Sequence, residues 1–178
     1  GKKLKKLGYR SIDSAELIFE DFRVSADNLV GGELGKGFQQ VAGGLELGRI
    51  NIAARGAGMA KGATNMALHY AMDRKTFGKA IAEHQAIQLK LAEMSTRAAA
   101  AELLVHQAAD KFDRHERCDL EAGQAKFFAS EAAVQNSLDA MRVFGGYSYS
   151  PEYEIERFYR DAPLLCIGEG TNEIQRMI

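Results

Sequence analysis

The sequence predicts an all-α protein, in which an antiparallel four-helix up-and-down bundle is preceded by a short β remnant. Apolar residues recur at spacings of three and four over long stretches of the chain. Only two prolines occur, at Pro151 and Pro163, so most of the chain is free to form long helices. Long helices with short connections pack as an antiparallel bundle.

The N-terminal residues follow a different pattern. From Tyr9 to Val30 apolar and acidic residues alternate loosely, and Gly31-Gly32 ends this pattern with residues typical of turns. We expect one or two strands and a linker here. Because two strands do not hold a sheet together, we expect them to be the edge of a β domain whose remainder is absent from this chain.

The first helix is predicted over residues 38–72, which would extend about 50 Å at the helical rise. Its apolar face consists of Phe38, Val41, Leu45, Ile52, Met59, Met66 and Tyr70. Each glycine within it costs roughly 1 kcal/mol of helix propensity relative to alanine. Because Gly43, Gly44, Gly56, Gly58 and Gly62 all lie in this stretch, we expect a second helix or a ligand to approach it closely.

Two further helices are predicted over residues 83–114 and 120–144, and a last one begins at Asn172. The positions expected to face the core are Ile87, Leu91, Met94, Leu103, Leu104 and Val105 in the second helix and Phe127, Phe128, Val134, Leu138 and Met141 in the third.

Composition excludes several classes of protein. A formal net charge of -1 gives no electrostatic reason to expect nucleic acid as a partner. No apolar run is long enough to span a membrane, and no apolar stretch follows Gly1–Lys6 to form a signal peptide, so we expect a soluble, cytoplasmic protein. Cys118 and Cys166 have no Cys or His at metal-ligand spacing, so we predict no metal site.

A carboxylate between two glycines, Gly168-Glu169-Gly170, is the best indication of chemistry. Flanking glycines allow a tight loop, and Thr171 or Asn172 can cap a helix that follows. A carboxylate fixed on such a loop and shielded from water can have a raised pKa and accept a proton from a weak carbon acid. The alternative is an ordinary solvated glutamate.

A second candidate site lies between the first two helices, at Asp73–Lys79 followed by His84-Gln85. Arg74, Lys75 and the hydroxyl of Thr76 near a helix start would form a phosphate site. Alternatively, the two cations only satisfy the helix dipole at a C-terminus. The pair Gly145-Gly146 after the third helix also has two interpretations, because it can belong to a ligand site or be an ordinary C-cap.

Taken in order, these motifs closely resemble the acyl-CoA dehydrogenase family over essentially the whole chain. The matching segments are Leu47-Gly48-Arg49, Arg74–Lys79, His84–Gln88, Phe144–Tyr147, Arg157–Asp161 and Glu169–Gln175, together with the opening segment Glu16–Val24. The resemblance implies that residues 36–178 form the C-terminal four-helix domain and residues 1–35 the end of the middle β domain and a linker. It also implies a flavoprotein that oxidises an acyl-CoA thioester to trans-2-enoyl-CoA.

The resemblance assigns Glu169 as the catalytic base that removes the pro-R α-proton while hydride passes from the β-carbon to FAD. Some relatives place the base immediately before the residue corresponding to Arg49, but that position is Gly48 here. Cofactor contacts are implied for Arg74, Lys75, Thr76, Gln85, Arg142, Gly145, Gly146, Thr171, Asn172 and Glu173. Substrate contacts are implied for Glu46, Arg49 and Gly170. Arg142 stands where many relatives carry Gln.

The resemblance further implies an electron-transferring flavoprotein as acceptor and a homodimer or homotetramer that shares cofactor contacts between subunits. The expected location is the cytoplasm of a bacterium or the mitochondrial matrix of a eukaryote. We expect this chain alone neither to hold FAD tightly nor to turn over acyl-CoA.

Three alternatives remain open. An acyl-CoA oxidase-like or desulfinase-like flavoprotein would share the fold, and oxygen consumption or product analysis would distinguish it. A thioester-binding module without redox activity would be unaffected by Glu169→Gln. A purely structural bundle would have an exposed, mobile Glu169 and no phosphate ligand near Arg74.

Overall fold

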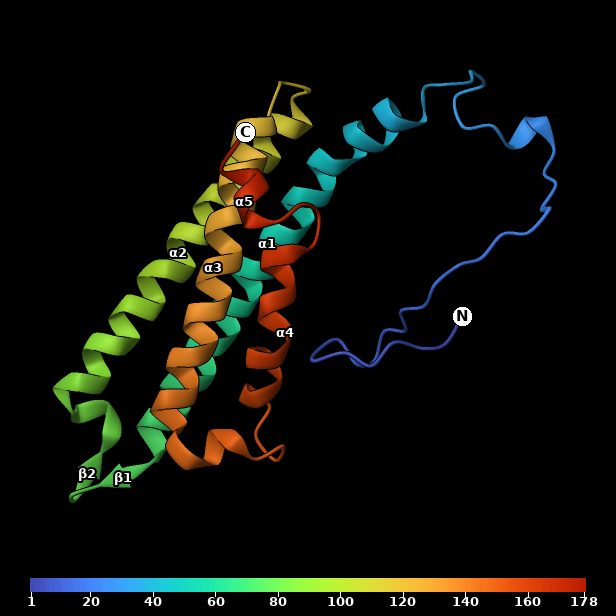
Figure 1. Ribbon diagram of the computed structural model, residues 1–178. Helices are drawn as coiled ribbons and strands as arrows, with labels where there is room; N and C mark the ends of the chain where they lie inside the picture. The colour runs from blue at the N-terminus through green and yellow to red at the C-terminus, as the bar shows by residue number, and fades with distance from the viewer.

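Four long helices form the body of the protein in a computed structural model that describes residues 1–178 (Figure 1). They are α1 (Gly37–Asp73), α2 (Gln85–Asp113), α3 (Asp119–Phe144) and α4 (Ile155–Ile167), and they run alternately up and down. The short helix α5 (Asn172–Gln175) ends the chain beside α3. The predicted all-α antiparallel bundle is confirmed.

A tight hairpin joins α1 to α2. Strands β1 (Lys75–Thr76) and β2 (Lys79–Ala80) pair antiparallel, with Lys75 opposite Ala80 and Thr76 opposite Lys79. Its two turn residues, Phe77 and Gly78, have φ angles of 51° and 81°, the left-handed conformation that two-residue hairpins require.

The fourth helix of the bundle was predicted wrongly. We placed it from Asn172 onward, but α5 covers only four residues, and α4 occupies the fourth position. Pro163 lies inside α4, where its ring removes one backbone donor from the helix. Burial of Ile155, Ala162 and Leu165 along one face of α4 offsets that loss.

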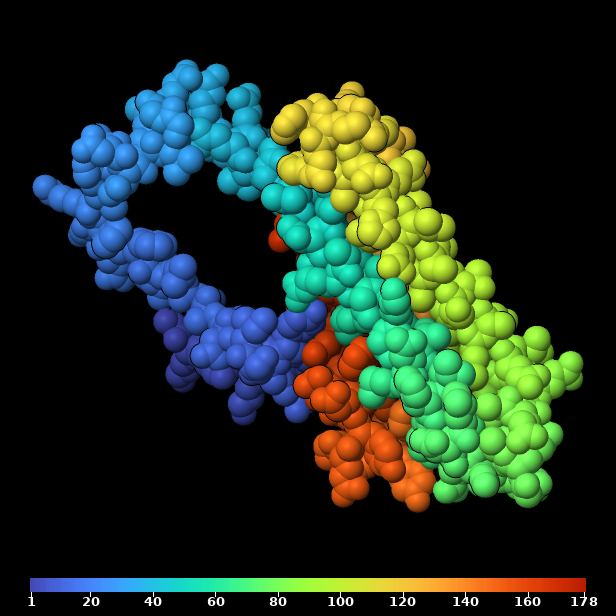
Figure 2. Space-filling view, turned by 180° about the vertical axis from the view of Figure 1, so that it is seen from behind, coloured from blue at the N-terminus to red at the C-terminus, as the bar shows by residue number.

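Residues 1–36 contain no strand, which differs from the prediction for residues 9–30. The segment is extended, with only a 3-10 turn at Ala26–Asn28, and it leaves the bundle and returns to it near α4 (Figure 2). There the Tyr9 amide donates to Asp161 Oδ1 at 2.7 Å, and the Arg55 guanidinium lies 5.0 Å from the Tyr9 ring centroid. A strand needs a neighbour for its backbone groups, and this chain supplies none for residues 9–30.

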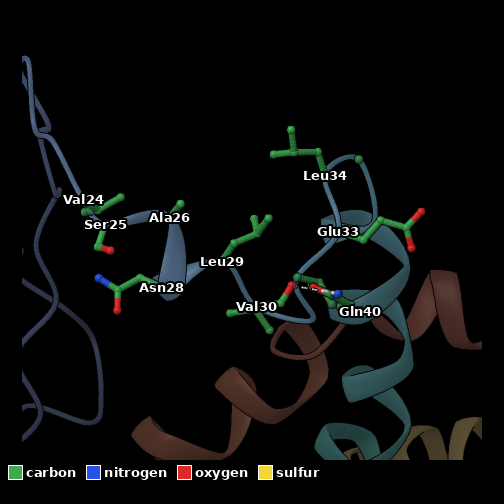
Figure 3. Close-up of a pocket in the computed structure, with 12 residues that line it drawn as sticks. Val24, Ser25, Ala26, Asn28, Leu29, Val30, Glu33, Leu34 and Gln40 are labelled. Atoms are coloured by element: carbon green, nitrogen blue, oxygen red, sulfur yellow. Dashed lines mark hydrogen bonds between the residues drawn. The ribbon is translucent and has the colours of Figure 1, made fainter.

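A hollow of about 920 Å³ lies where the linker meets the start of α1 (Figure 3). The Gln40 side-chain amide crosses it to donate to the Val30 carbonyl at 3.1 Å. Leu34 and Phe38 beside it are more than four-fifths exposed. The linker is therefore held to α1 by little more than this contact.

The helix core is built mainly from alanines, which lets the helix backbones approach closely. A Cβ atom on Gly56 of α1 would lie 2.7 Å from the Ala129 carbonyl oxygen of α3, and one on Gly62 would lie 2.9 Å from the Phe158 ring of α4. Close packing at these two glycines confirms the prediction. Gly43, Gly44 and Gly58 have no such neighbour in this chain, so close approach at these three glycines stays a prediction.

A buried polar network ties the middle of the bundle together. The Asn136 amide of α3 donates to the Ala60 carbonyl of α1 at 3.2 Å and to the Met94 carbonyl of α2 at 2.8 Å. Arg97 Nε donates to Asn136 Oδ1 at 2.7 Å, and Lys90 pairs with buried Asp139 at 3.1 Å. None of the helices has the length and hydropathy of a membrane span.

Candidate functional site

The predicted site residues gather at opposite ends of the bundle. Gly48, which lies between Glu46 and Arg49 on α1, is next to Glu169 in the loop between α4 and α5. Arg74 follows the last residue of α1, at the end of the bundle where the hairpin lies (Figure 1). Arg49 and Arg74 are separated by about 38 Å along α1 at the helical rise. A single chain therefore has two partial sites.

The loop that carries Glu169 is tight, as predicted. Helix α4 ends at Ile167, and Glu169 and Gly170 follow with φ angles of 54° and 89°. Thr171 then caps α5 by accepting the Ile174 amide at 3.5 Å. A glutamate in the left-handed region costs of order 1–3 kcal/mol and persists only where its surroundings fix it.

The Glu169 carboxylate lies directly against the backbone of α1. A Cβ atom on Gly48 would be 2.6 Å from Glu169 Oε2 and 3.0 Å from its Cδ, so only glycine leaves room for the carboxylate at this position. We predicted that the Glu169 carboxylate is shielded from water. Within these 178 residues it is exposed. The backbone N–H of Glu169 donates no hydrogen bond within the chain.

Side chains from the core hold the carbonyl groups of this loop. Gln175 Nε2 donates to the Glu169 and Gly170 carbonyls at 3.3 and 3.1 Å. Lys126 Nζ of α3 donates to the Gly170 carbonyl and to Asn172 Oδ1, both at 2.8 Å. Neither Lys126 nor Gln175 was predicted from the sequence to take part in the site. A lysine in line with Ala122 and Ala129 on the buried face of a helix was the available signal for the first.

Asn172 is buried, and its side chain is fully used inside the protein. Besides accepting from Lys126, it donates to Glu131 Oε1 at 2.8 Å and hydrogen-bonds to Ser130. Only its backbone is free for the cofactor contact that the resemblance implied. Glu173 is exposed, and its pKa is lowered by backbone N–H groups at the start of α5 and by the Thr171 side chain.

The predicted substrate residues on α1 lie close to the same loop. Arg49 Nε is buried and has no hydrogen-bond partner, which leaves a donor free for a ligand. Glu46 Oε2 lies 3.8 Å from Cys118 Sγ. Burial raises the pKa of the Cys118 thiol, and the neighbouring Glu46 carboxylate raises it further, so Cys118 is a core thiol.

At the other end of the bundle, a groove of about 660 Å³ brings together four of the predicted cofactor residues. They are Arg74, Thr76, Gly145 and Gly146. The Arg74 guanidinium lies 5.7 Å from the Tyr147 ring centroid, and Thr76 Oγ1 lies 3.2 Å from His84 Nε2. Helix α2 begins beside the groove without a side-chain cap, so its first amides add donors there.

The alternative explanation for Arg74 and for Gly145, that each only ends a helix, describes the backbone correctly. Arg74 is the C-cap of α1, and Gly145, at φ 64°, is the C-cap of α3. This explanation does not account for the groove that these caps share. An exposed cation, a hydroxyl and a helix N-terminus around one groove fit a phosphate-bearing ligand.

Three further predicted cofactor residues at this end of the bundle lie outside the groove lining. Lys75 on β1 and Gln85 at the start of α2 are exposed beside it. Arg142 Nη1 instead donates to Asp139 Oδ1 at 3.2 Å, so its side chain extends the polar network of the core. The structure contains no group of His, Cys, Asp or Glu side chains that could hold a metal ion.

Comparison with known proteins gives a consistent result. The model of the acyl-CoA dehydrogenase C-terminal domain matches residues 35–178. An acyl-CoA dehydrogenase of Bacillus subtilis is 49% identical over 178 residues, and a subunit of the caffeyl-CoA reductase-Etf complex of Acetobacterium woodii is 40% identical; each alignment covers 100% of this chain and 47% of the relative.

The same holds for solved structures. Butyryl-CoA dehydrogenase from Megasphaera elsdenii superposes with a TM-score of 0.97 at 41% identity, covering 100% of this chain and 46% of that one. The chain thus spans about half the length of the relatives it matches. On the family model and these alignments, the chain belongs to the acyl-CoA dehydrogenase family, as its C-terminal domain.

Proposed function

We propose that the whole protein converts an acyl-CoA thioester to its trans-2-enoyl form, with Glu169 as the base that accepts the α-proton. The observation that carries this proposal is the contact between the Glu169 carboxylate and Gly48. The carboxylate lies on a tight loop, against a helix that leaves room for it, with its own N–H free.

The free N–H of Glu169 gives the same residue a second role. Negative charge develops on the thioester oxygen as the α-proton leaves, and a fixed donor aimed at that oxygen lowers the barrier. Hydrogen bonds from Gln175 to the Glu169 and Gly170 carbonyls hold the backbone at residue 169. The Glu169 N–H is left free to donate to the thioester oxygen. One residue thus accepts the proton and steadies the charge that proton loss creates.

FAD would supply the acceptor for hydride from the β-carbon. The groove residues fit such a group, because Arg74 and the uncapped start of α2 would hold phosphate oxygens and Gly145 would allow close approach of the backbone. Because this groove and Glu169 lie at opposite ends of the bundle, we propose that each cofactor contacts two subunits of a homodimer or homotetramer.

An electron-transferring flavoprotein is the proposed electron acceptor. The name of the Acetobacterium relative, a subunit of a reductase-Etf complex, favours this partner. An acyl-CoA is the proposed substrate, in line with the Bacillus and Megasphaera relatives.

The test compares Glu169→Gln with the native full-length protein in dye reduction by a panel of acyl-CoA substrates. Loss of a general base typically costs 10²–10⁴-fold in rate, so kcat should fall by at least about 100-fold. Glu116→Gln is the matched control, since Glu116 is exposed and pairs only with Arg114. Equal kcat for Glu169→Gln and the native protein would rule out the proposed base.

A further inference from the structure

We propose that Lys126 is a positioning residue that fixes the Glu169 loop in its reactive conformation. The proposal rests on the proposed function, because it assumes that Glu169 is the base. Lys126 lies within α3 and is fully buried, and it is not among the residues proposed to contact the cofactor or the substrate.

The Lys126 ammonium connects the chain on both sides of Glu169. Its Nζ donates to the Cys166 carbonyl at 3.2 Å, in the last turn of α4, and to the Gly170 carbonyl at 2.8 Å, immediately after the base. The third hydrogen bond goes to Asn172 Oδ1 at 2.8 Å, at the start of α5. An ammonium has three donors, and all three hold this one loop.

No carboxylate compensates the buried charge directly. The three acceptors of Lys126 Nζ are uncharged oxygens, and burial lowers the pKa of its ammonium. A buried cation held only by neutral oxygens is costly, and a methionine would fill the same space in a helix core without that cost. Packing alone therefore does not explain a lysine here.

The hydrogen-bonded geometry does explain it. Glu169 and Gly170 adopt left-handed backbone angles that must be held in place. Gln175 holds the Glu169 and Gly170 carbonyls from one side, and Lys126 holds the Cys166 and Gly170 carbonyls from the other. Without the ammonium, the carboxylate would lose the fixed distance to its target.

Lys126 is fully buried and its three donors are occupied by protein oxygens, so its loss should change the rate of the chemical step and not substrate binding. A displacement of about 1 Å in a reacting group can cost about 100-fold in rate. We therefore expect Lys126→Met to lower kcat by about 100-fold, with KM and the dissociation constant for enoyl-CoA product within about threefold of the native values. Lys126→Gln, whose side chain is one bond shorter and keeps two N–H donors in place of three, should recover about tenfold of that loss.

The experiment uses the full-length flavin-loaded protein, with Lys111→Met as the matched control. Lys111 of α2 donates to Glu121 at 2.6 Å and does not contact the loop, so its loss should leave kcat unchanged. Thermal unfolding checks that each variant is folded. If Lys126→Met does not fold, Lys126→Gln alone is measured. We expect its kcat to be about tenfold lower than that of the native protein, with KM unchanged.

Different results would overturn the positioning role of Lys126 and the catalytic role of Glu169. Native kcat in a folded Lys126→Met or Lys126→Gln variant, or a loss that appears in KM alone, would overturn the positioning role even if Glu169→Gln is inactive. An active Glu169→Gln variant would overturn the function on which the inference rests.

Discussion

Gly56 offers a sensitive test of how the bundle is packed. Replacing it with alanine would place a methyl group 2.7 Å from the Ala129 carbonyl oxygen, 2.8 Å from the Ala129 carbonyl carbon and 3.1 Å from the Ser130 nitrogen. All three are backbone atoms of α3, which cannot rotate away as a side chain would. Helices α1 and α3 must therefore separate locally.

The magnitude follows from two opposing terms. Alanine improves helix propensity by about 1 kcal/mol relative to glycine, and overpacking of a closely packed interface costs about 1–3 kcal/mol. Gly58→Ala supplies the control, because Gly58 lies on the same helix and a methyl group there meets no atom within 4 Å. The difference between the two variants isolates the steric term, so Gly56→Ala should be about 1–3 kcal/mol less stable than Gly58→Ala.

Urea unfolding followed by far-ultraviolet circular dichroism measures this difference, since the signal comes mainly from the helices. The free energies of unfolding of both variants would be compared with that of the native protein under identical conditions. If Gly56→Ala and Gly58→Ala stabilise the protein equally, α1 and α3 do not pack as closely as we describe.

Two further predictions concern the site and the polar core. Gly48→Ala should lower kcat by about 100-fold without lowering thermal stability, because the added methyl meets only the far end of the Glu169 side chain and no backbone atom. Steady-state kinetics with a melting curve would show this, and an unchanged kcat would contradict the contact. Burial alone would raise the pKa of Asp139, but hydrogen bonds from Gln135 and Lys90 outweigh it and hold the pKa below its ordinary 3.8. The stability that Asp139 contributes is therefore fully present above pH 3.8 and is lost as the pH falls below it. Asp139→Asn should flatten this acid dependence of the unfolding free energy, and an equally steep dependence in the variant would assign it to other groups.

The long helices could be predicted from the sequence because their apolar spacing is sustained for many turns. The boundaries of α1, α2 and α3 differ from the predicted ones by no more than two residues. Helix α4 was missed because it is short and contains Pro163, although its buried residues recur at helical spacing. The strands expected in residues 9–30 are absent because strand formation depends on a partner, which local sequence does not specify.

Short motifs of the candidate site could be recognised in the sequence, but the residues that hold the Glu169 loop in place could not. The tight loop at Glu169 and the Thr171 cap followed from short-range rules about glycine and helix caps. Arg74 and Gly145, which line one groove, were connected only through the resemblance to the family. The contact between Glu169 and Gly48 joins residues far apart in the chain, so periodicity could not reveal it. The burial of Lys126 could have been predicted from its alignment with Ala122 and Ala129 on one helix face, but its three acceptors could not, since they all lie at least 40 positions away.

A crystal structure of the full-length protein with a non-reactive acyl-CoA analogue bound would test the role of Glu169 as the base. We predict that a Glu169 carboxylate oxygen lies about 3–3.5 Å from the α-carbon of the acyl group, with Gly48 behind it and the Glu169 N–H directed at the thioester oxygen. A Glu169 side chain that points into bulk solvent, with another group beside the α-carbon, would contradict it.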